Sequence, residues 1–96
     1  MLKWKNIIGT ADRKPKSGYD SWLDFYEQNS GKSSKTCKVK GCTNKATVGA
    51  HVRKARLRKN QDRSWYIVPL CHSCTHIEDM FELNADASPV SVRLHK

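Results

Sequence analysis

Four cysteines are the residues of this chain whose type and spacing most clearly indicate chemistry. They form two pairs, Cys37 with Cys42 and Cys71 with Cys74. Zinc favours four soft ligands in a tetrahedron, and two short cysteine pairs supply such a set with little strain. Because four protein ligands leave no open coordination position, we expect one structural rather than catalytic zinc ion per chain.

The same cysteines could form disulfides instead, so the cellular compartment decides between the two. The N-terminal sequence MLKWKNIIGT lacks the apolar stretch of about 7–15 residues that a secretory signal needs. No segment approaches the roughly 20 apolar residues of a membrane span. We therefore expect a cytoplasmic chain with no membrane contact, whose thiols stay reduced and available to a metal.

The positive charge is concentrated in one third of the chain. The net charge is +9 at pH 7, yet residues 32–63 hold eleven Lys or Arg against one acid, Asp62, and carry +10. Such a segment favours a polyanionic partner, nucleic acid above all, and the alternative is a solvated loop without a ligand. The candidate nucleic-acid-binding residues are Arg53, Lys54, Arg56, Arg58, Lys59, Arg63 and the aromatic Trp65. Trp65 could stack on unpaired bases or belong to the core.

The elements that position these residues begin with an N-terminal extension over residues 1–35. Trp4–Ile8 is expected to form a short strand and Gly9–Gly18 a loop. Asp20 or Ser21 then caps a helix that ends at Gly31. An aromatic face on this helix, expected to pack on the core, consists of Trp22, Phe25 and Tyr26.

The second part, residues 36–96, contains the cysteines. Residues 46–53 alternate and predict a strand with Ala46, Val48, Ala50 and Val52 on one face and Thr47, Gly49, His51 and Arg53 on the other. A basic loop follows at 54–64, then a second strand at 65–70, so the two predict a hairpin. Cys71 opens a helix predicted over residues 72–83, and PVSVRL predicts a last strand. The fold class expected is therefore α+β.

A knuckle, a hairpin and Cys-x2-Cys at the start of a helix form the layout of a treble-clef zinc domain. The segments GAHV (49–52) and VPLCHSCTH (68–76) further resemble the HNH (His-Me finger) endonuclease family. The resemblance covers about residues 37–82. It implies that the four cysteines hold the structural zinc, and that a histidine on the first hairpin strand activates water beside a divalent metal to cleave a phosphodiester.

Carried over to this chain, the resemblance places His51 at the position of the general base. Ala50 stands where the family usually has an acidic residue, Tyr66 where it has an asparagine, and Thr75 where it has a histidine. Because alanine cannot bind a metal, the catalytic motif is degenerate. Some compensation is conceivable from three polar residues at i, i+4 and i+7 of the predicted helix, namely His72, His76 and Asp79. They could hold a second metal, Mg²⁺ or a similar ion, or form an ordinary solvated face.

Two functions of different classes follow. The first is a zinc-stabilised, non-catalytic domain of degenerate HNH type that binds DNA or RNA. The alternative is an active HNH-like nuclease with His51 as general base and a divalent ion held by the helix residues. A protein–protein adaptor remains a third reading, and nothing in the sequence names its partner.

Overall fold

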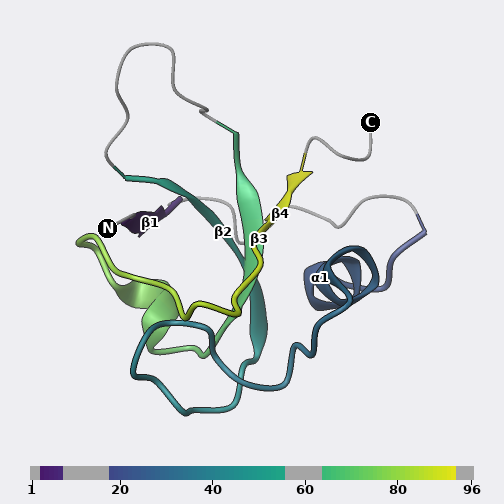
Figure 1. Ribbon diagram of the computed structural model, residues 1–96, viewed down its shortest axis with the longest axis horizontal. Coiled ribbons are helices and arrows are strands. Elements are labelled where there is room, and N and C mark those ends of the chain that lie inside the picture. The colour runs from purple at the N-terminus through teal and green to yellow at the C-terminus, as the bar shows by residue number, and fades with distance from the viewer. Residues whose placement is uncertain (1–2, 8–17, 56–63, 93–96) are drawn as a thin grey trace.

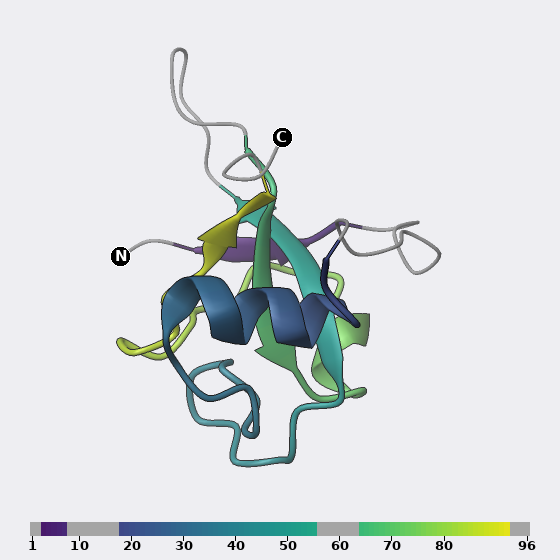
Figure 2. The same ribbon diagram turned by 90° about the vertical axis from the view of Figure 1, so that its right-hand side faces the viewer.

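One antiparallel sheet organises the fold, with its strands in the order β1-β2-β3-β4. The computed structural model describes residues 3–7, 18–55 and 64–92 of the chain. Its elements in chain order are β1 (Trp4–Asn6), α1 (Trp22–Ser30), β2 (Val48–Lys54), β3 (Tyr66–Leu70), the 3₁₀ helix η1 (Cys74–His76) and β4 (Val90–Ser91). Figure 1 shows α1 on one side of the sheet and η1 on the other, and Figure 2 shows α1 lying across the sheet. The α+β class is thereby confirmed.

α1 begins and ends at the residues that the sequence predicts. The side chain of Ser21 accepts a hydrogen bond of 3.1 Å from the backbone N–H of Asp24, which satisfies a donor of the first turn. Gly31 ends the helix with a φ of 71°, and its N–H bonds to the carbonyl of Glu27. Glycine adopts this left-handed conformation without strain, so the helix stops cleanly.

The aromatic face of α1 packs on the sheet, as predicted. Phe25 and Tyr26 are fully buried. The hydroxyl of Tyr26 donates a hydrogen bond to the carbonyl of Ala87, which ties the helix to the segment before β4. On the sheet side, a Cβ added at Gly49 would lie 2.5 Å from the Cβ of Trp22. Only a glycine therefore lets β2 approach the helix this closely.

The predicted hairpin is confirmed, but both of its faces are covered. β2 and β3 pair antiparallel from Val48 with Leu70 to Val52 with Tyr66. Val52 is fully buried on one face and His51 is only 5% exposed on the other. The polar face expected of β2 lies under α1, so His51 is a core residue. Residues 56–63 of the predicted basic loop lie outside the described residues.

The helix predicted over residues 72–83 is wrong. Only Cys74–His76 form a helical turn, and Ile77 is already extended, with φ −65° and ψ 119°. The chain beyond it forms two isolated antiparallel bridges, Phe81 with Trp4 and Leu83 with Val39. These pairings satisfy the backbone through partners distant in sequence and bury Phe81, so tertiary pairing outweighs the local helical pattern.

One hydrophobic core joins the N-terminal elements to the part of the chain that holds the cysteines. Trp4 of β1 and Phe25 of α1 belong to the same cluster of buried residues as the β2–β3 hairpin and three of the cysteines. β1 and β4 confirm a strand in each predicted terminal segment, but both are shorter than predicted, because Ile7, Pro89 and Val92 lie outside them. Among the ranges that the structure describes, no helix is long and apolar enough to cross a membrane.

Candidate metal centre

Two loops at one end of the hairpin bring the four cysteines together. One pair precedes β2 and the other follows β3. Because Val48 pairs with Leu70 at this end of the hairpin, the two loops are neighbours. The first loop is a tight knuckle in which the N–H of Cys42 bonds to the carbonyl of Val39 at 2.9 Å. Gly41 permits this turn with a φ of 84°.

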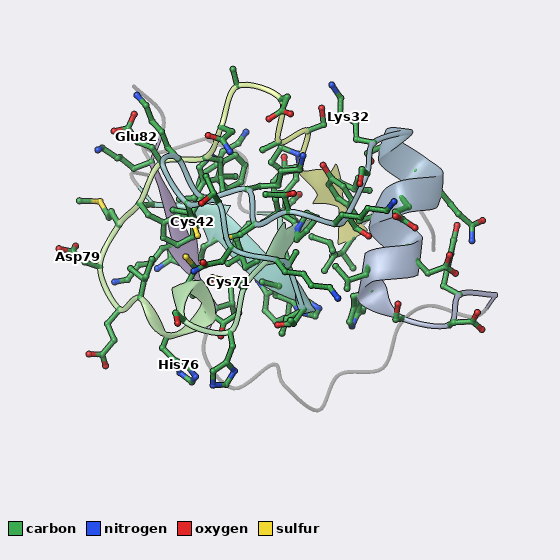
Figure 3. The ribbon with its side chains drawn as sticks, turned by 90° about the horizontal axis from the view of Figure 1, so that it is seen from below. Lys32, Cys42, Cys71, His76, Asp79 and Glu82 are labelled. Carbon is green, nitrogen blue, oxygen red and sulfur yellow. The ribbon has the colours of Figure 1, made fainter. Side chains whose placement is uncertain are left out.

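The four sulfurs converge on one point. Their Sγ atoms all lie within 4.8 Å of one another, and those of Cys42 and Cys71 are 3.8 Å apart. Figure 3 shows these two labelled cysteines side by side. All four cysteines are free of disulfides, three of them are buried and Cys42 is half-buried. This cluster could hold a metal ion.

Hydrogen bonds within the cluster single out one sulfur. Burial raises the pKa of the Cys71 thiol, but donors around its sulfur outweigh that effect and bring the pKa down to about 6. The backbone of Cys74 and the Nδ2 of Asn44, 3.8 Å from the sulfur, are two of these donors. Burial raises the pKa of Cys37 and of Cys74. An ion held by all four sulfurs must therefore displace protons, because thiolates rather than thiols ligate metals.

The turn that holds the second cysteine pair is anchored from β1. The side-chain Nδ2 of Asn6 donates hydrogen bonds of 3.0 Å to the carbonyls of both Cys74 and Ile77. These carbonyls flank the single turn of η1, and so short a helix offers them few hydrogen-bond donors. Asn6 thus replaces the support that a longer helix would have given, and the sequence carries no local signal for it.

His51 lies between two tryptophans. Its ring centroid is 4.8 Å from that of Trp22 and 6.0 Å from that of Trp65, both in edge-to-face orientation. The preceding Ala50 is buried on the opposite face of β2, where it pairs with Val68. The structure therefore places no carboxylate at the residue before His51.

A cavity of about 700 Å³ runs between the start of α1, the strand β2 and the η1 turn. Three of the four histidines of the chain line it, His51, His72 and His76. His72 and His76 are exposed, and their Nε2 atoms lie 3.3 Å apart. Sequence reasoning expected these two histidines to share a face, and they do so on a turn rather than on a helix.

Asp79, the third residue of that predicted face, lies elsewhere. Figure 3 shows it well away from the labelled His76, because the chain is extended from Ile77 onward. Its Oδ1 accepts a hydrogen bond from the backbone N–H of Met80. Among the described residues, the four cysteines form the only group of three or more Cys, His, Asp or Glu close enough to share an ion.

The basic residues singled out by the sequence are only partly described. Arg56, Arg58, Lys59 and Arg63 lie outside the described residues. Arg53 and Lys54 end β2 on opposite faces, and the Nζ of Lys54 sits 5.6 Å from the ring centroid of Tyr66. Trp65 is half-buried beside His51.

The sequence reasoning missed one cation, Lys5. It lies in β1 directly opposite Arg53 of β2, and both are half-buried. The sequence predicted a strand here, but its pairing with a strand almost fifty positions away carried no local signal.

Comparison with known protein families, with curated proteins and with solved structures finds no match in any of the three.

Proposed function

We propose that this protein is a zinc-stabilised, non-catalytic domain that binds nucleic acid, DNA or RNA, through Lys5, Arg53 and Trp65, which are half-buried at the end of the sheet away from the cysteines. The observation that carries the proposal is the direct opposition of Lys5 and Arg53 across β1 and β2. The resemblance to HNH endonucleases in GAHV and VPLCHSCTH is consistent with a nucleic-acid ligand.

The ion proposed for the cysteine cluster is zinc. A tetrahedral zinc with Zn–S bonds of about 2.3 Å separates its sulfurs by about 3.8 Å. That is the separation of the Cys42 and Cys71 sulfurs, and the remaining pairs lie within 4.8 Å. With four protein ligands the ion is structural. In this proposal the domain is a shortened treble clef, whose last helix is reduced to η1.

Like charges directly opposite each other in a sheet repel, so an anion bound between Lys5 and Arg53 would be stabilising. Alternation along β2 puts Arg53 on the same face as His51, and Lys5 shares that face because it is the partner of Arg53. Within the described part of the chain, neither cation forms an ion pair with an acid. A phosphate group lying between them would remove the repulsion and explain the arrangement.

An aromatic side chain completes this face. The ring of Trp65 lies against His51, on the side of the sheet that bears the two cations. Lysine and arginine neutralise phosphates, whereas an accessible indole stacks on unpaired bases. The combination favours a single strand or a strand end over an intact duplex.

Absence of catalysis is supported by the surroundings of His51. Ala50 supplies no metal ligand, and the described residues bring together no three-ligand group other than the cysteines. A structural role as the ring packed between Trp22 and Trp65 accounts for His51 without chemistry.

The test measures the binding of labelled single-stranded DNA, duplex DNA and single-stranded RNA by fluorescence anisotropy over a range of salt concentrations. Lys5→Gln and Arg53→Gln should each weaken binding and reduce the slope of log K against log salt by about 1. Lys32→Gln is the matched control, because it removes the same charge from an exposed position at the far end of α1 (Figure 3). Equal loss in all three variants, or no salt-dependent binding by the native chain, would contradict the proposal.

One observation favours nuclease activity as a second candidate. His51, His72 and His76 line one cavity, so a general base and two imidazole ligands could act on one phosphate. A plasmid-nicking assay with Mg²⁺, Mn²⁺ or Ni²⁺, run beside His51→Ala, decides between the two. Nicking that the mutation abolishes, with folding verified by amide spectra, would establish the enzyme. If the protein binds nucleic acid but nicks the plasmid with none of these metals, the non-catalytic binding module is the function that stands.

A further inference from the structure

We propose that Cys42 is a site of reversible oxidation by hydroperoxides, and that its oxidation forms a disulfide with Cys71 and releases the metal ion from the cluster. This inference rests on the zinc ion proposed above for the four cysteines. It is independent of nucleic-acid binding.

Exposure distinguishes Cys42 from the other three cysteines. Cys37, Cys71 and Cys74 are at most 8% exposed, whereas Cys42 is half-buried. Oxidation of a cysteine depends on the access of the oxidant to its sulfur. A small oxidant in solution therefore meets the sulfur of Cys42 first.

The segment around Cys42 is also the part of the cluster that can move with the least loss of packing. Its neighbours on both sides, residues 40–41 and 43–45, are exposed. In contrast, Cys71 follows directly on Leu70, which is fully buried at the end of β3. Segments with few buried contacts open at a lower free-energy cost than the core does. The knuckle can therefore shift when the sulfur of Cys42 changes its bonding.

The sulfur of Cys71 lies beside that of Cys42, at a distance of 3.8 Å. A disulfide holds its sulfurs about 2.0 Å apart, so the two must approach by about 1.8 Å. Cys42 precedes β2 and Cys71 follows β3, so the new bond joins the same two loops that the ion joins. A redox-sensitive cysteine is typically accessible and close to a second thiol that resolves its oxidised form. Cys42 and Cys71 meet both conditions.

The chemistry takes two steps and consumes one molecule of hydrogen peroxide. In the first step the thiolate of Cys42 attacks the peroxide, an S–O bond forms, the O–O bond breaks, and hydroxide leaves and takes up a proton to become water. In the second step the thiolate of Cys71 attacks the sulfenic acid on Cys42. The S–S bond forms, the S–O bond breaks, and the second hydroxide also leaves as water. Two electrons pass from the two sulfurs to the peroxide.

Loss of the ion follows from loss of two ligands. Thiolates bind zinc, and a disulfide supplies none. Cys37 and Cys74 alone cannot complete a tetrahedral set, so the ion leaves. A thiol reductant opens the disulfide by exchange and restores the four ligands. Because metal binding and folding are one equilibrium in small zinc domains, the device restricts the folded state to reducing conditions.

The experiment exposes the full chain, loaded with zinc, to hydrogen peroxide in the presence of a colour-forming zinc chelator, with a sample that receives the chelator alone. Peroxide should release the zinc and abolish the free thiols of Cys42 and Cys71. Peptide mapping by mass spectrometry should find the first disulfide between these two residues. Dithiothreitol and added zinc should restore the thiols and the bound ion. Thr43→Ala, at the exposed neighbour of Cys42, is the control and should lose zinc as the native chain does.

Two histidine substitutions separate the roles of the two cysteines, because histidine also binds zinc in tetrahedral sites. Cys42→His should keep its zinc in peroxide that empties the native site. Cys71→His should accumulate a sulfenic acid on Cys42, which dimedone traps. If either variant fails to fold, the disulfide map of the native chain decides by itself.

Three results would overturn the inference: zinc retained by the native chain in peroxide, a first disulfide that does not include Cys42, or zinc lost from Cys42→His as fast as from the native chain. A native chain that binds no zinc before peroxide is added would refute the zinc proposal itself. The two failures are thereby distinguishable.

Discussion

The cysteine cluster and the histidine-lined cavity share one turn, residues 71–77, yet they use it in opposite ways. The cysteines point inward, where three of the four are buried and all four converge. The two histidines of the turn point outward to the rim of a cavity. A closed set of four ligands leaves no coordination position open to a substrate. One short segment therefore contributes two cysteines to the cluster on one side and two exposed histidines to the cavity on the other.

The largest effect expected is on the closed side. Cys74→Ala should unfold the chain, because metal binding contributes about 10–16 kcal/mol in small zinc domains, which is comparable to or more than the stability of most domains. Amide spectra should collapse and the zinc content should fall well below one per chain. Ser73→Ala, at the exposed neighbour, should change neither. A well-dispersed amide spectrum for Cys74→Ala would contradict a structural role for the cysteine cluster.

The wall of the cavity should be the next most sensitive part. Gly49→Ala places a Cβ 2.5 Å from the Cβ of Trp22 and 2.7 Å from its backbone carbon. Because backbone atoms have to move, we expect a loss at or above the upper end of the roughly 1–3 kcal/mol typical of overpacking. Urea denaturation measures this loss, and zinc content should stay at one per chain. Gly31→Ala is the comparison variant, because Gly31 has a positive φ and open space around it. Its loss reports the cost of an alanine at positive φ, whereas the loss at Gly49 reports crowding.

The anchor of α1 should matter less. Tyr26→Phe leaves the buried carbonyl of Ala87 without its donor and should cost about 1–3 kcal/mol. Burial raises the pKa of the Tyr26 hydroxyl above 10.0, so the folded chain holds that proton longer than the unfolded chain. The native protein should therefore lose stability as the pH rises through about 10, and the variant should lose less. An unchanged alkaline slope in the variant would contradict this account.

The smallest effect is expected on the open side. His76→Gln should change the free energy of unfolding by less than about 0.5 kcal/mol, because the side chain is exposed and outside the core. Thermal unfolding of the zinc-loaded protein measures it against the native chain. A loss of several kcal/mol would mean that the histidines belong to the structural centre, and the contrast between the two faces of the turn would fail.

Features with a local signal could be predicted from the sequence. Ser21 and Gly31 mark the ends of α1, and the cysteine spacing marks the cluster, because caps and knuckles are made by neighbours along the chain. The hairpin followed from alternation in β2 and from the apolar run of β3. These elements are correct because local pattern and tertiary packing agree.

Features made by distant partners could not be predicted. The pattern of residues 72–83 suited a helix, but pairing of Phe81 with Trp4 decided its conformation. The sequence left a structural and a catalytic role open for His51, because its cover by Trp22 of α1 depends on packing between distant segments. The placement of Lys5 opposite Arg53 depends on β1 pairing with β2 across about half of the chain, and no nearby residue encodes that register.

Pro69 lies within β3, where a proline is unusual. It pairs with Gly49 at a position where the backbone faces away from β2, and its carbonyl accepts the N–H of Lys38 at 2.9 Å. The short β4 pairs with β3 only at Tyr66 and Ile67, so this stretch of the sheet edge lies beyond its reach. The buried segment at Lys38 occupies this edge instead and forms only the bond to the carbonyl of Pro69. Having no N–H of its own, Pro69 leaves no unpaired backbone donor at this buried position beside the cysteines.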